Sequence, residues 1–334
     1  MISLALLPRL SRSGRPPKVA MAARRLGAAV AAGSTAVACA YLGMPSERRG
    51  PPYKSLTPGQ LLHSTLLAKS RVESDCVRLQ FELPSPEHTL GLPVPGHVMV
   101  IDAANNYRPY SPITIDSTTA GSFELLVKEY PHGEFSSKLS RMEPGDQASF
   151  VGPVASRYEY RRGSTRHLGL VAAGTGITPM WQIIQAVLTN PEDCTRVSLV
   201  YASSSAEGIL LKDELDRAAA SHPERLSITY LASQPATRGT RLPADVQRGR
   251  VCADVLAARL PPPPRADEPD SEETRAACQL LVCGPEAMLR ELCGPRARDG
   301  GVTPQGAGGA QAELPAIGGL LGSLGYRANQ VTWL

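Results

Sequence analysis

The sequence of 334 residues has no Cys-x-x-Cys pair, although it contains seven cysteines. Zinc sites and ferredoxin-type clusters need closely spaced cysteines that converge on one metal, so the spacing supports neither kind of site. An odd and dispersed set of thiols also indicates a reducing compartment. The cysteines are Cys39, Cys76, Cys194, Cys252, Cys278, Cys283 and Cys293.

Acidic residues are absent from residues 1–46, which carry six of the 35 basic residues of the chain. The remaining 29 basic residues stand against 31 acidic ones, so the rest of the chain has a net charge of about −2 and the formal +4 belongs to the N-terminus. This distribution gives no reason to expect a nucleic-acid partner. The length and the 42% of apolar residues are typical of a globular protein with two domains.

Residues 1–46 have the composition of a mitochondrial targeting segment, because they are basic, acid-free and rich in Ala and Ser. Within them, residues 26–44 form a charge-free run of 19 residues. A helix of that length just crosses a hydrocarbon core of about 30 Å, but the Ala and Gly content makes the run weakly apolar. The segment is therefore expected to be a weak membrane anchor or a cleaved or peripheral presequence, with a disordered tail as a third reading. Residues 47–62 are rich in proline and charge and are predicted to be a linker.

Residues 63–162 show the pattern of short strands. Val77, Leu79, Phe81 and Leu83 alternate with polar residues, as on a half-buried strand. Further strands are expected at residues 98–101, 123–130 and 147–151, with Pro, Gly and Asn turns between them. This pattern predicts a small antiparallel β-barrel.

Residues 163–334 change to an alternation of strands and helices, which predicts a parallel sheet with a nucleotide site at the strand ends. The Pro-rich, acidic residues 261–275 and the Gly/Ala-rich residues 294–319 are predicted to be loop insertions outside the core. Strands are expected at residues 167–173, 197–201, 226–231 and 279–283, and helices from residue 179 and at residues 210–220, 252–260 and 286–293.

Four motifs carry candidate chemistry. Residues 108–113 (Arg-Pro-Tyr-Ser-Pro-Ile) offer a guanidinium for a diphosphate and a flat ring for an isoalloxazine platform, on a strand that proline keeps extended. Residues 128–137 contain a Gly turn before Ser at a helix start, which suits a pyrophosphate. Taken alone, each of these two motifs is more often an ordinary surface strand or a capped helix.

The other two motifs follow predicted strands. Residues 173–180 (Ala-Gly-Thr-Gly-Ile-Thr-Pro-Met) let the backbone approach a dinucleotide before a helix begins. Residues 282–288 (Val-Cys-Gly-Pro-Glu-Ala-Met) place a thiol, a glycine and a helix start at the same edge of the sheet. A lone cysteine in such a place is more often a packing residue.

The order and spacing of these motifs resemble the ferredoxin–NADP reductase-like flavoenzymes, and residues 108–113, 127–130 and 324–331 are most similar to the NADH–cytochrome b5 reductase family. The resemblance covers about residues 63–334. It implies an FAD-binding β-barrel followed by an NAD(P)H-binding α/β domain. It also implies transfer of a hydride from NADH, or alternatively NADPH, to FAD, and then of single electrons to a haem-protein acceptor such as cytochrome b5.

The resemblance also assigns site residues by position. The FAD residues would be Arg108, Pro109, Tyr110, Ser111, Lys128, Tyr130, Gly133, Phe135 and Ser136; Thr178 would lie where flavin and nicotinamide meet; and Gly174, Gly176, Cys283, Gly284, Pro285 and Met288 would line the NAD(P)H site. Thr178 and Cys283 are the catalytic candidates, with Cys283 near the reacting carbon of the nicotinamide. No metal is implied.

The sequence departs from the family at two places. Residues 152–155 (Gly-Pro-Val-Ala) lack the second Gly of the family's Gly-Pro-x-Gly, so the loop over the flavin is expected to differ. Residues 231–235 lack the acidic residue that repels a 2′-phosphate, which leaves the NADH preference open. The alternatives are a reductase for an oxygenase or a ferredoxin, and a nucleotide-binding scaffold without flavin turnover. No His-Pro-Gly-Gly motif of a fused b5 domain occurs, so the acceptor is expected to be a separate molecule. The expected location is a mitochondrial membrane, with the endoplasmic reticulum membrane as the alternative.

Overall fold

The computed structural model describes residues 53–334, except residues 74, 131–132, 235–241, 266 and 295–316. The predicted targeting segment therefore lies outside the described residues, as does most of the second predicted insertion. The described residues belong to one compact unit, residues 51–334. Within this described part of the chain, no helix is both long enough and apolar enough to cross a membrane.

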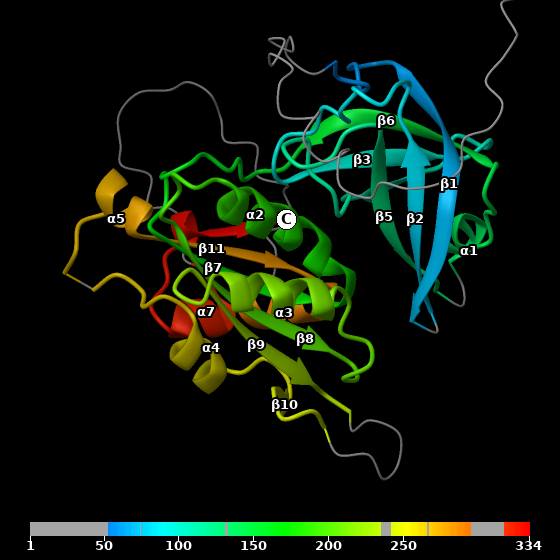
Figure 1. Ribbon diagram of the computed structural model, residues 1–334. Helices are drawn as coiled ribbons and strands as arrows, with labels where there is room; N and C mark the ends of the chain where they lie inside the picture. Colours follow the sequence, from blue (N-terminus) through cyan, green and yellow to red (C-terminus); the bar gives the residue numbers. More distant parts are fainter. Residues whose placement is uncertain (1–52, 74, 131–132, 235–241, 266, 295–316) are drawn as a thin grey trace, which may run out of the picture. The chain divides into compact units, whose positions relative to one another are not determined.

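The first sheet is antiparallel and has the strand order β4-β3-β6-β1-β2-β5 (Figure 1). The N–H of Ile113, just after β4, donates to the carbonyl oxygen of Glu124 in β5 over 2.9 Å, so the two edge strands are also connected. Phe81, Phe123 and Phe150 meet in its core with ring centroids 5.0–5.5 Å apart. The predicted barrel is confirmed. Its elements are β1 (Leu61–Glu73), β2 (Cys76–Glu82), β3 (Gly96–Ile101), β4 (Tyr107–Tyr110), β5 (Ser122–Lys128), α1 (Glu134–Ser140) and β6 (Gln147–Ala155).

The prediction of a linker at residues 47–62 is wrong for its described half. The N–H groups of Ser55 and Leu56 donate to the carbonyl oxygens of Thr89 and Leu90 over 2.9 and 3.0 Å. Leu56 is buried in the barrel core, and β1 already begins at Leu61. The buried Leu56 side chain and these backbone hydrogen bonds hold the segment on the barrel, although its prolines suggest a spacer.

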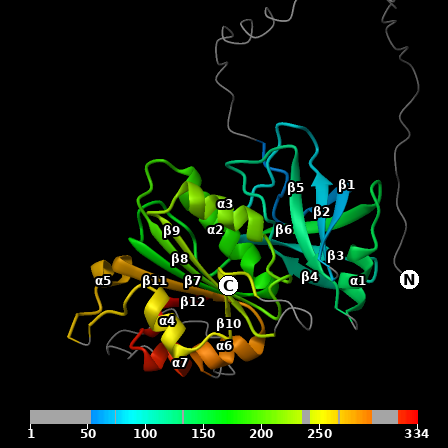
Figure 2. The ribbon, with the colours of Figure 1, turned by 60° about the horizontal axis from the view of Figure 1, so that its bottom comes forward.

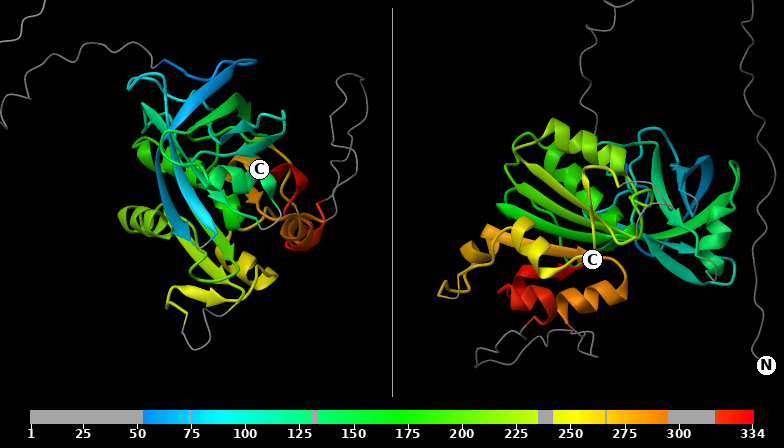
Figure 3. Two further views of the ribbon diagram at one scale, coloured as in Figure 1. Left: turned by 90° about the vertical axis from the view of Figure 1, so that its right-hand side faces the viewer. Right: turned by 90° about the horizontal axis from the view of Figure 1, so that it is seen from below.

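The second sheet is parallel and has the order β10-β9-β8-β7-β11-β12, which confirms the predicted α/β architecture. Alternate strand residues face opposite sides. Leu170 and Leu199 pack with α2 and α3, whereas Val171 and Val200 pack with α4, α6 and α7. Figures 2 and 3 show these two helical layers with the sheet between them.

Most elements of this part agree with the predicted ones to within three residues. β10, α5, α7 and β12 were not predicted, since they are short and have no continuous apolar run such as the one that marks β11. The elements are β7 (His167–Ala173), a 3-10 turn (Gly174–Gly176), α2 (Ile177–Thr189), β8 (Arg196–Ser203), α3 (Lys212–Ser221), β9 (Leu226–Ala232), β10 (Val246–Arg248), α4 (Ala253–Arg259), α5 (Glu272–Ala277), β11 (Cys278–Cys283), α6 (Glu286–Cys293), α7 (Gly319–Ser323), a second 3-10 turn (Ala328–Gln330) and β12 (Val331–Trp333).

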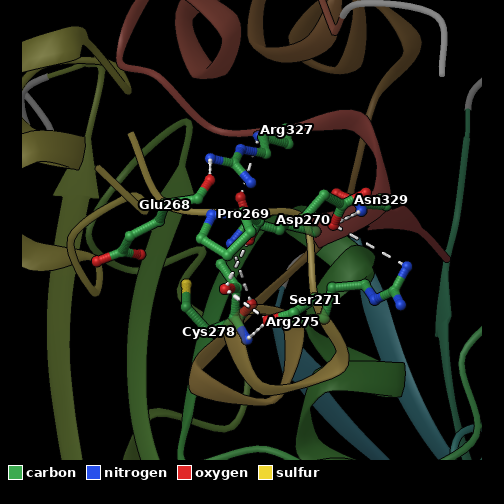
Figure 4. Close-up of polar contacts among 10 residues, drawn as sticks. Glu268, Pro269, Asp270, Ser271, Arg275, Cys278, Arg327 and Asn329 are labelled. Carbon is green, nitrogen blue, oxygen red and sulfur yellow. Dashed lines mark hydrogen bonds and ion pairs between the residues drawn. The ribbon is translucent and has the colours of Figure 1, made fainter. Parts of the chain in front are cut away.

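The prediction of a loop outside the core at residues 261–275 is also wrong in part. Pro261 is buried and its carbonyl oxygen accepts a 2.6 Å hydrogen bond from the Tyr326 hydroxyl. Arg327 donates to the carbonyl oxygens of Arg265 and Glu268 over 3.1 and 2.6 Å (Figure 4). The segment then ends in α5, whose N-cap is Ser271. These contacts come from residues about 60 positions later in the sequence, so local composition could not reveal them.

Candidate functional site

All of the predicted site residues line one cavity of about 1390 Å³, which takes its walls from both sheets. Those residues are Arg108, Pro109, Tyr110, Ser111, Lys128, Tyr130, Gly133, Phe135, Ser136, Gly174, Gly176, Thr178, Cys283, Gly284, Pro285 and Met288. The structure therefore brings together four motifs that lie up to 180 positions apart in the sequence. Their individual roles stay predictions, and the geometry below shows what each can do.

Arg108 and Tyr110 lie on β4, at the edge of the first sheet. An edge strand tolerates Pro109 between them, because its missing N–H is not needed for pairing. The half-buried Tyr110 ring stacks on Phe135 of α1, with centroids 6.5 Å apart and planes inclined by 24°. Burial raises the pKa of the Tyr110 hydroxyl to about 12, so the ring is neutral. The exposed Arg108 guanidinium donates to the carbonyl oxygen of Tyr107 and keeps its other donors for a ligand.

Helix α2 holds the segment that follows β4. Gln182 is 1% exposed, and its side chain accepts from the Gly96 N–H over 2.9 Å and donates to the Pro112 carbonyl oxygen over 2.7 Å. Gln185 donates to the Ile113 carbonyl oxygen over 2.8 Å. The helix that starts in the nucleotide motif thus fixes the position of the Arg-Pro-Tyr-Ser-Pro-Ile segment. Sequence reasoning missed this role, since the sequence does not show which groups a glutamine in an apolar helix contacts.

The segment from Lys128 to Ser136 forms a tight turn before α1. The Ser136 hydroxyl donates to the Gly133 carbonyl oxygen over 3.0 Å and accepts from the Tyr130 N–H over 3.3 Å. A Cβ at Gly133 would lie 2.6 Å from the Ser136 oxygen, so only glycine fits this turn. Lys128 pairs with Asp75 over 3.1 Å. Ser136 and Lys128 therefore shape this wall of the cavity, and the N–H groups of residues 134–136 at the start of α1 have no backbone partner among the described residues.

The Gly-Thr-Gly motif lies where the strand order changes direction, between β7 and β11, which is the usual ligand position in such sheets. Gly174 has φ +55° with open space beside it, and a Cβ at Gly176 would meet the Cys283 carbonyl oxygen at 2.3 Å. The buried Tyr201 hydroxyl donates to the Gly174 carbonyl oxygen over 3.0 Å. Thr178 is buried and donates to the Thr175 carbonyl oxygen over 3.0 Å, so its hydroxyl stabilises the loop at the cavity wall.

Cys283 ends β11, and Gly284 and Pro285 lead from it into α6. Burial raises the pKa of the Cys283 thiol to about 11, so the group is an uncharged thiol at neutral pH and not a nucleophile. The Met288 methyl group packs so closely on Gly284 that a Cβ there would lie 2.6 Å from it. This corner of the cavity is thus tight, uncharged and weakly polar.

Sequence reasoning missed several residues that line the same cavity. His97 lies on β3 and Asp102 directly after it. Trp333 ends β12 and Leu334 follows it, and Ala155 is the last residue of β6. Ala155 stands where the family's second glycine was expected, and the segment is strand and not loop. A second group comes from the ends of β8 and β10 and comprises Ser203, Ser204, Gly249 and Arg250; it lies with Ser233, which belongs to the acid-free stretch 231–235 noted in the sequence. The rule that ligands bind at the carboxyl ends of parallel strands could have found the serines.

These features fit a flavin and a nicotinamide nucleotide. A free guanidinium, a flat neutral ring and a helix start suit a flavin diphosphate and its ring system, while two glycine turns at the change of strand order suit a dinucleotide.

Comparison with known proteins agrees with this geometry. Residues 63–160 match the oxidoreductase FAD-binding domain family, and residues 170–294 match the oxidoreductase NAD-binding domain family. A Candida glabrata protein named NADH-cytochrome b5 reductase 1 is 36% identical over 242 residues, which are 72% of this chain and 79% of that protein. An Arabidopsis thaliana protein of the same name is 32% identical over 271 residues, 80% and 89% of the two chains. The cytochrome b5 reductase domain of Ulva prolifera nitrate reductase superposes with a TM-score of 0.61 at 30% identity, over 71% of this chain and 92% of that domain.

Proposed function

The chain belongs to the NADH–cytochrome b5 reductase family, and from this premise we propose that it passes single electrons to a separate haem protein of the cytochrome b5 type. The chain is an oxidoreductase that uses FAD and NADH. The observation that supports the proposal most is that the FAD motifs and the nucleotide motifs line one cavity. When bound there, FAD supplies the exchange between two-electron hydride transfer and one-electron release.

The residues of the chain orient the reactants. Arg108 offers its free N–H donors to the diphosphate, and the Tyr110 ring, supported by Phe135, offers a neutral flat surface. The protonated Cys283 thiol and the packed Met288 leave no fixed charge in the corner where the two glycine turns meet. Such a corner would suit the uncharged nicotinamide ring of the reduced donor.

Two other functions compete with this proposal, and the experiment described below distinguishes them from it. A reductase for an oxygenase or a ferredoxin could have the same two domains and the same flavin reaction, and would differ only in its electron acceptor. A nucleotide-binding scaffold without flavin turnover would lack the coloured cofactor. The retained Arg108, Tyr110 and Ser111 in the cavity wall speak against the scaffold, and the names of the relatives favour a cytochrome b5 acceptor.

The deciding experiment uses the purified full-length protein in detergent. We expect a yellow protein whose flavin absorbance is bleached by NADH and which reduces both ferricyanide and a soluble cytochrome b5. A colourless protein would favour the scaffold. Rapid reduction of ferricyanide and of a plant-type ferredoxin, but not of cytochrome b5, would overturn the proposed acceptor while leaving the flavin reaction in place.

We propose further that residues 1–44 direct the protein to a mitochondrial membrane, because they hold six basic residues and no acid before a body of net charge about −2. Their removal is expected to leave ferricyanide reduction unchanged and to release the protein into the cytosol. Full-length tagged protein in the soluble cytosolic fraction would contradict the targeting role. Recovery with the endoplasmic reticulum would instead support the alternative membrane.

A further inference from the structure

The outer wall of the cavity, formed by the ends of three neighbouring parallel strands, carries a cation and hydroxyl groups and no acid. Ser203 ends β8 and Ser204 follows it, Ser233 follows β9, and Gly249 and Arg250 follow β10. All five line the cavity. The acidic residues that line the same cavity, Asp102, Glu134 and Glu291, come from other elements, after β3 and within α1 and α6.

Backbone hydrogen bonds hold these strand ends side by side. The Ser233 N–H donates to the Ser203 carbonyl oxygen over 3.1 Å. The Gly249 N–H donates to the Ala232 carbonyl oxygen over 2.9 Å, directly before Arg250. Because the wall is tied to the sheet in this way, the serine hydroxyls and the base of the Arg250 side chain are preorganised.

The polar groups of this wall are free to meet a ligand. Arg250 is exposed, and it makes no hydrogen bond or ion pair with any residue that the structure describes. Two acids flank this stretch in the sequence, and neither lines the cavity: Asp245, directly before β10, pairs with Lys212, and Asp254 lies in the first turn of α4. The Ser204 hydroxyl likewise has no partner among the described residues, and the Ser233 hydroxyl has only a 3.4 Å contact to the Ser204 carbonyl oxygen.

The distance of this wall from the glycine turn after β7 indicates which part of a dinucleotide can reach it. Neighbouring strands lie about 4.8 Å apart, so β10 is about 14 Å from β7 across the sheet. A dinucleotide that binds along the strand ends, with its nicotinamide at Cys283, therefore places its adenosine half against β8, β9 and β10. In sheets of this kind a carboxylate at that place binds the ribose 2′-hydroxyl, and an arginine accommodates a 2′-phosphate.

We infer that Arg250, with the hydroxyls of Ser204 and Ser233, forms a subsite for the 2′-phosphate of NADPH, so that this chain uses NADPH as well as NADH. The forked guanidinium suits a phosphate dianion, and the hydroxyls complete its hydrogen bonds. The absence of a carboxylate on this wall removes the like-charge repulsion that would otherwise exclude NADPH. The inference rests on the nucleotide site and not on the proposed acceptor.

Binding of two adenosine probes to the full-length protein tests the subsite without turnover. We expect 2′,5′-ADP to bind at least tenfold more tightly than 5′-AMP in isothermal titration calorimetry, with a preference that falls as NaCl is raised. Arg250→Gln should weaken 2′,5′-ADP binding about 10- to 150-fold and leave 5′-AMP binding unchanged, because a charge-assisted contact of this kind is lost. Ser233→Asp should weaken 2′,5′-ADP selectively by at least about tenfold, by like-charge repulsion.

The matched control is Arg248→Gln, which removes an exposed arginine of β10 that does not line the cavity. It should change neither dissociation constant. With ferricyanide as acceptor, Arg250→Gln should raise the KM for NADPH at least tenfold more than the KM for NADH, whereas Arg248→Gln should leave both values unaltered. Equal affinity of the wild type for both probes, equal weakening of both by Arg250→Gln, or a preference for NADH of about 1,000-fold or more would overturn the inference. Failure to reduce cytochrome b5 would bear only on the acceptor.

Discussion

Replacement of Gln182 by Met should separate the flavin motif from the helix that holds it. The side chain is 1% exposed and satisfies two buried groups of the barrel, the Gly96 N–H at 2.9 Å and the Pro112 carbonyl oxygen at 2.7 Å. Methionine has a similar volume, so the packing is nearly kept while both hydrogen bonds are lost.

The magnitude follows from leaving both groups without partners. A buried polar group that loses its partner costs about 1–3 kcal/mol, so Gln182→Met should lower the free energy of unfolding by about 2–6 kcal/mol. FAD affinity should fall as well, because Pro112 directly follows the Arg-Pro-Tyr-Ser segment that lines the cavity. The disturbance reaches the flavin through the position of this segment and not through contact with Gln182.

Urea unfolding followed by circular dichroism measures the first effect, and flavin fluorescence on dilution measures the second. Gln247→Met is the control, since Gln247 is exposed on β10 and has no side-chain hydrogen bond within the described structure. Its effect should stay within about 0.5 kcal/mol. A loss below about 1 kcal/mol in Gln182→Met, with unchanged FAD retention, would show that other groups replace the glutamine and would refute the reasoning.

Three further predictions follow from side chains at the site and at the contact between the two sheets. Arg108→Ala should lower FAD affinity about 10- to 150-fold through loss of a charge-assisted contact, and unchanged flavin occupancy on dilution would contradict it. Cys283→Ala should slow flavin reduction by NADH in stopped flow more than it weakens FAD binding; since burial raises the thiol pKa to about 11, the wild-type rate should show no step from this group between pH 6 and 9, and a wild-type rate in the variant would make Cys283 a packing residue. Desolvation alone would raise the pKa of Glu214, but its hydrogen bond and ion pair with Arg78 lower it below the ordinary value, so the pair should contribute about 1 kcal/mol of stability above pH 5 that is lost as the pH falls through the lowered pKa. The difference in unfolding free energy between wild type and Glu214→Gln should therefore shrink as the pH falls through the lowered pKa of Glu214, and a difference that does not change with pH would count against the ion pair.

The two architectures and the four motifs could be predicted from the sequence because their signals are local. Apolar residues at every second position, as at Val77, Leu79 and Phe81, predict a strand with one buried face. Glycines directly after an apolar strand predict a tight turn, because few other residues adopt its backbone conformation. Short elements such as β10 and β12 carry too few residues for any periodicity to be distinguished. They form because a neighbouring strand offers free backbone groups, which is a property of the fold and not of the segment.

The errors have the same physical origin. By their prolines and charges, residues 47–62 resemble a linker and residues 261–275 a loop insertion, yet Leu56 is buried and Arg327 binds carbonyl oxygens of the second segment. Proline favours an extended chain whether or not the chain is packed, so its presence alone does not distinguish a spacer from a strap held by distant partners.

The missing acidic residue after β9 can be recognised in the sequence, but it does not by itself predict which donor binds. The missing acid after β9 leaves the choice of donor open, because an uncharged wall tolerates a 2′-phosphate without attracting it. The attraction needs Arg250, which lies 17 positions after Ser233 in the sequence and reaches the same wall only because β10 pairs with β9. β10, a three-residue strand without a local sequence signal, therefore determines whether the wall only tolerates a 2′-phosphate or binds it. Arg250→Gln and Arg248→Gln change the net charge of the chain equally, so a difference between them in 2′,5′-ADP affinity measures the contribution of the Arg250 position alone.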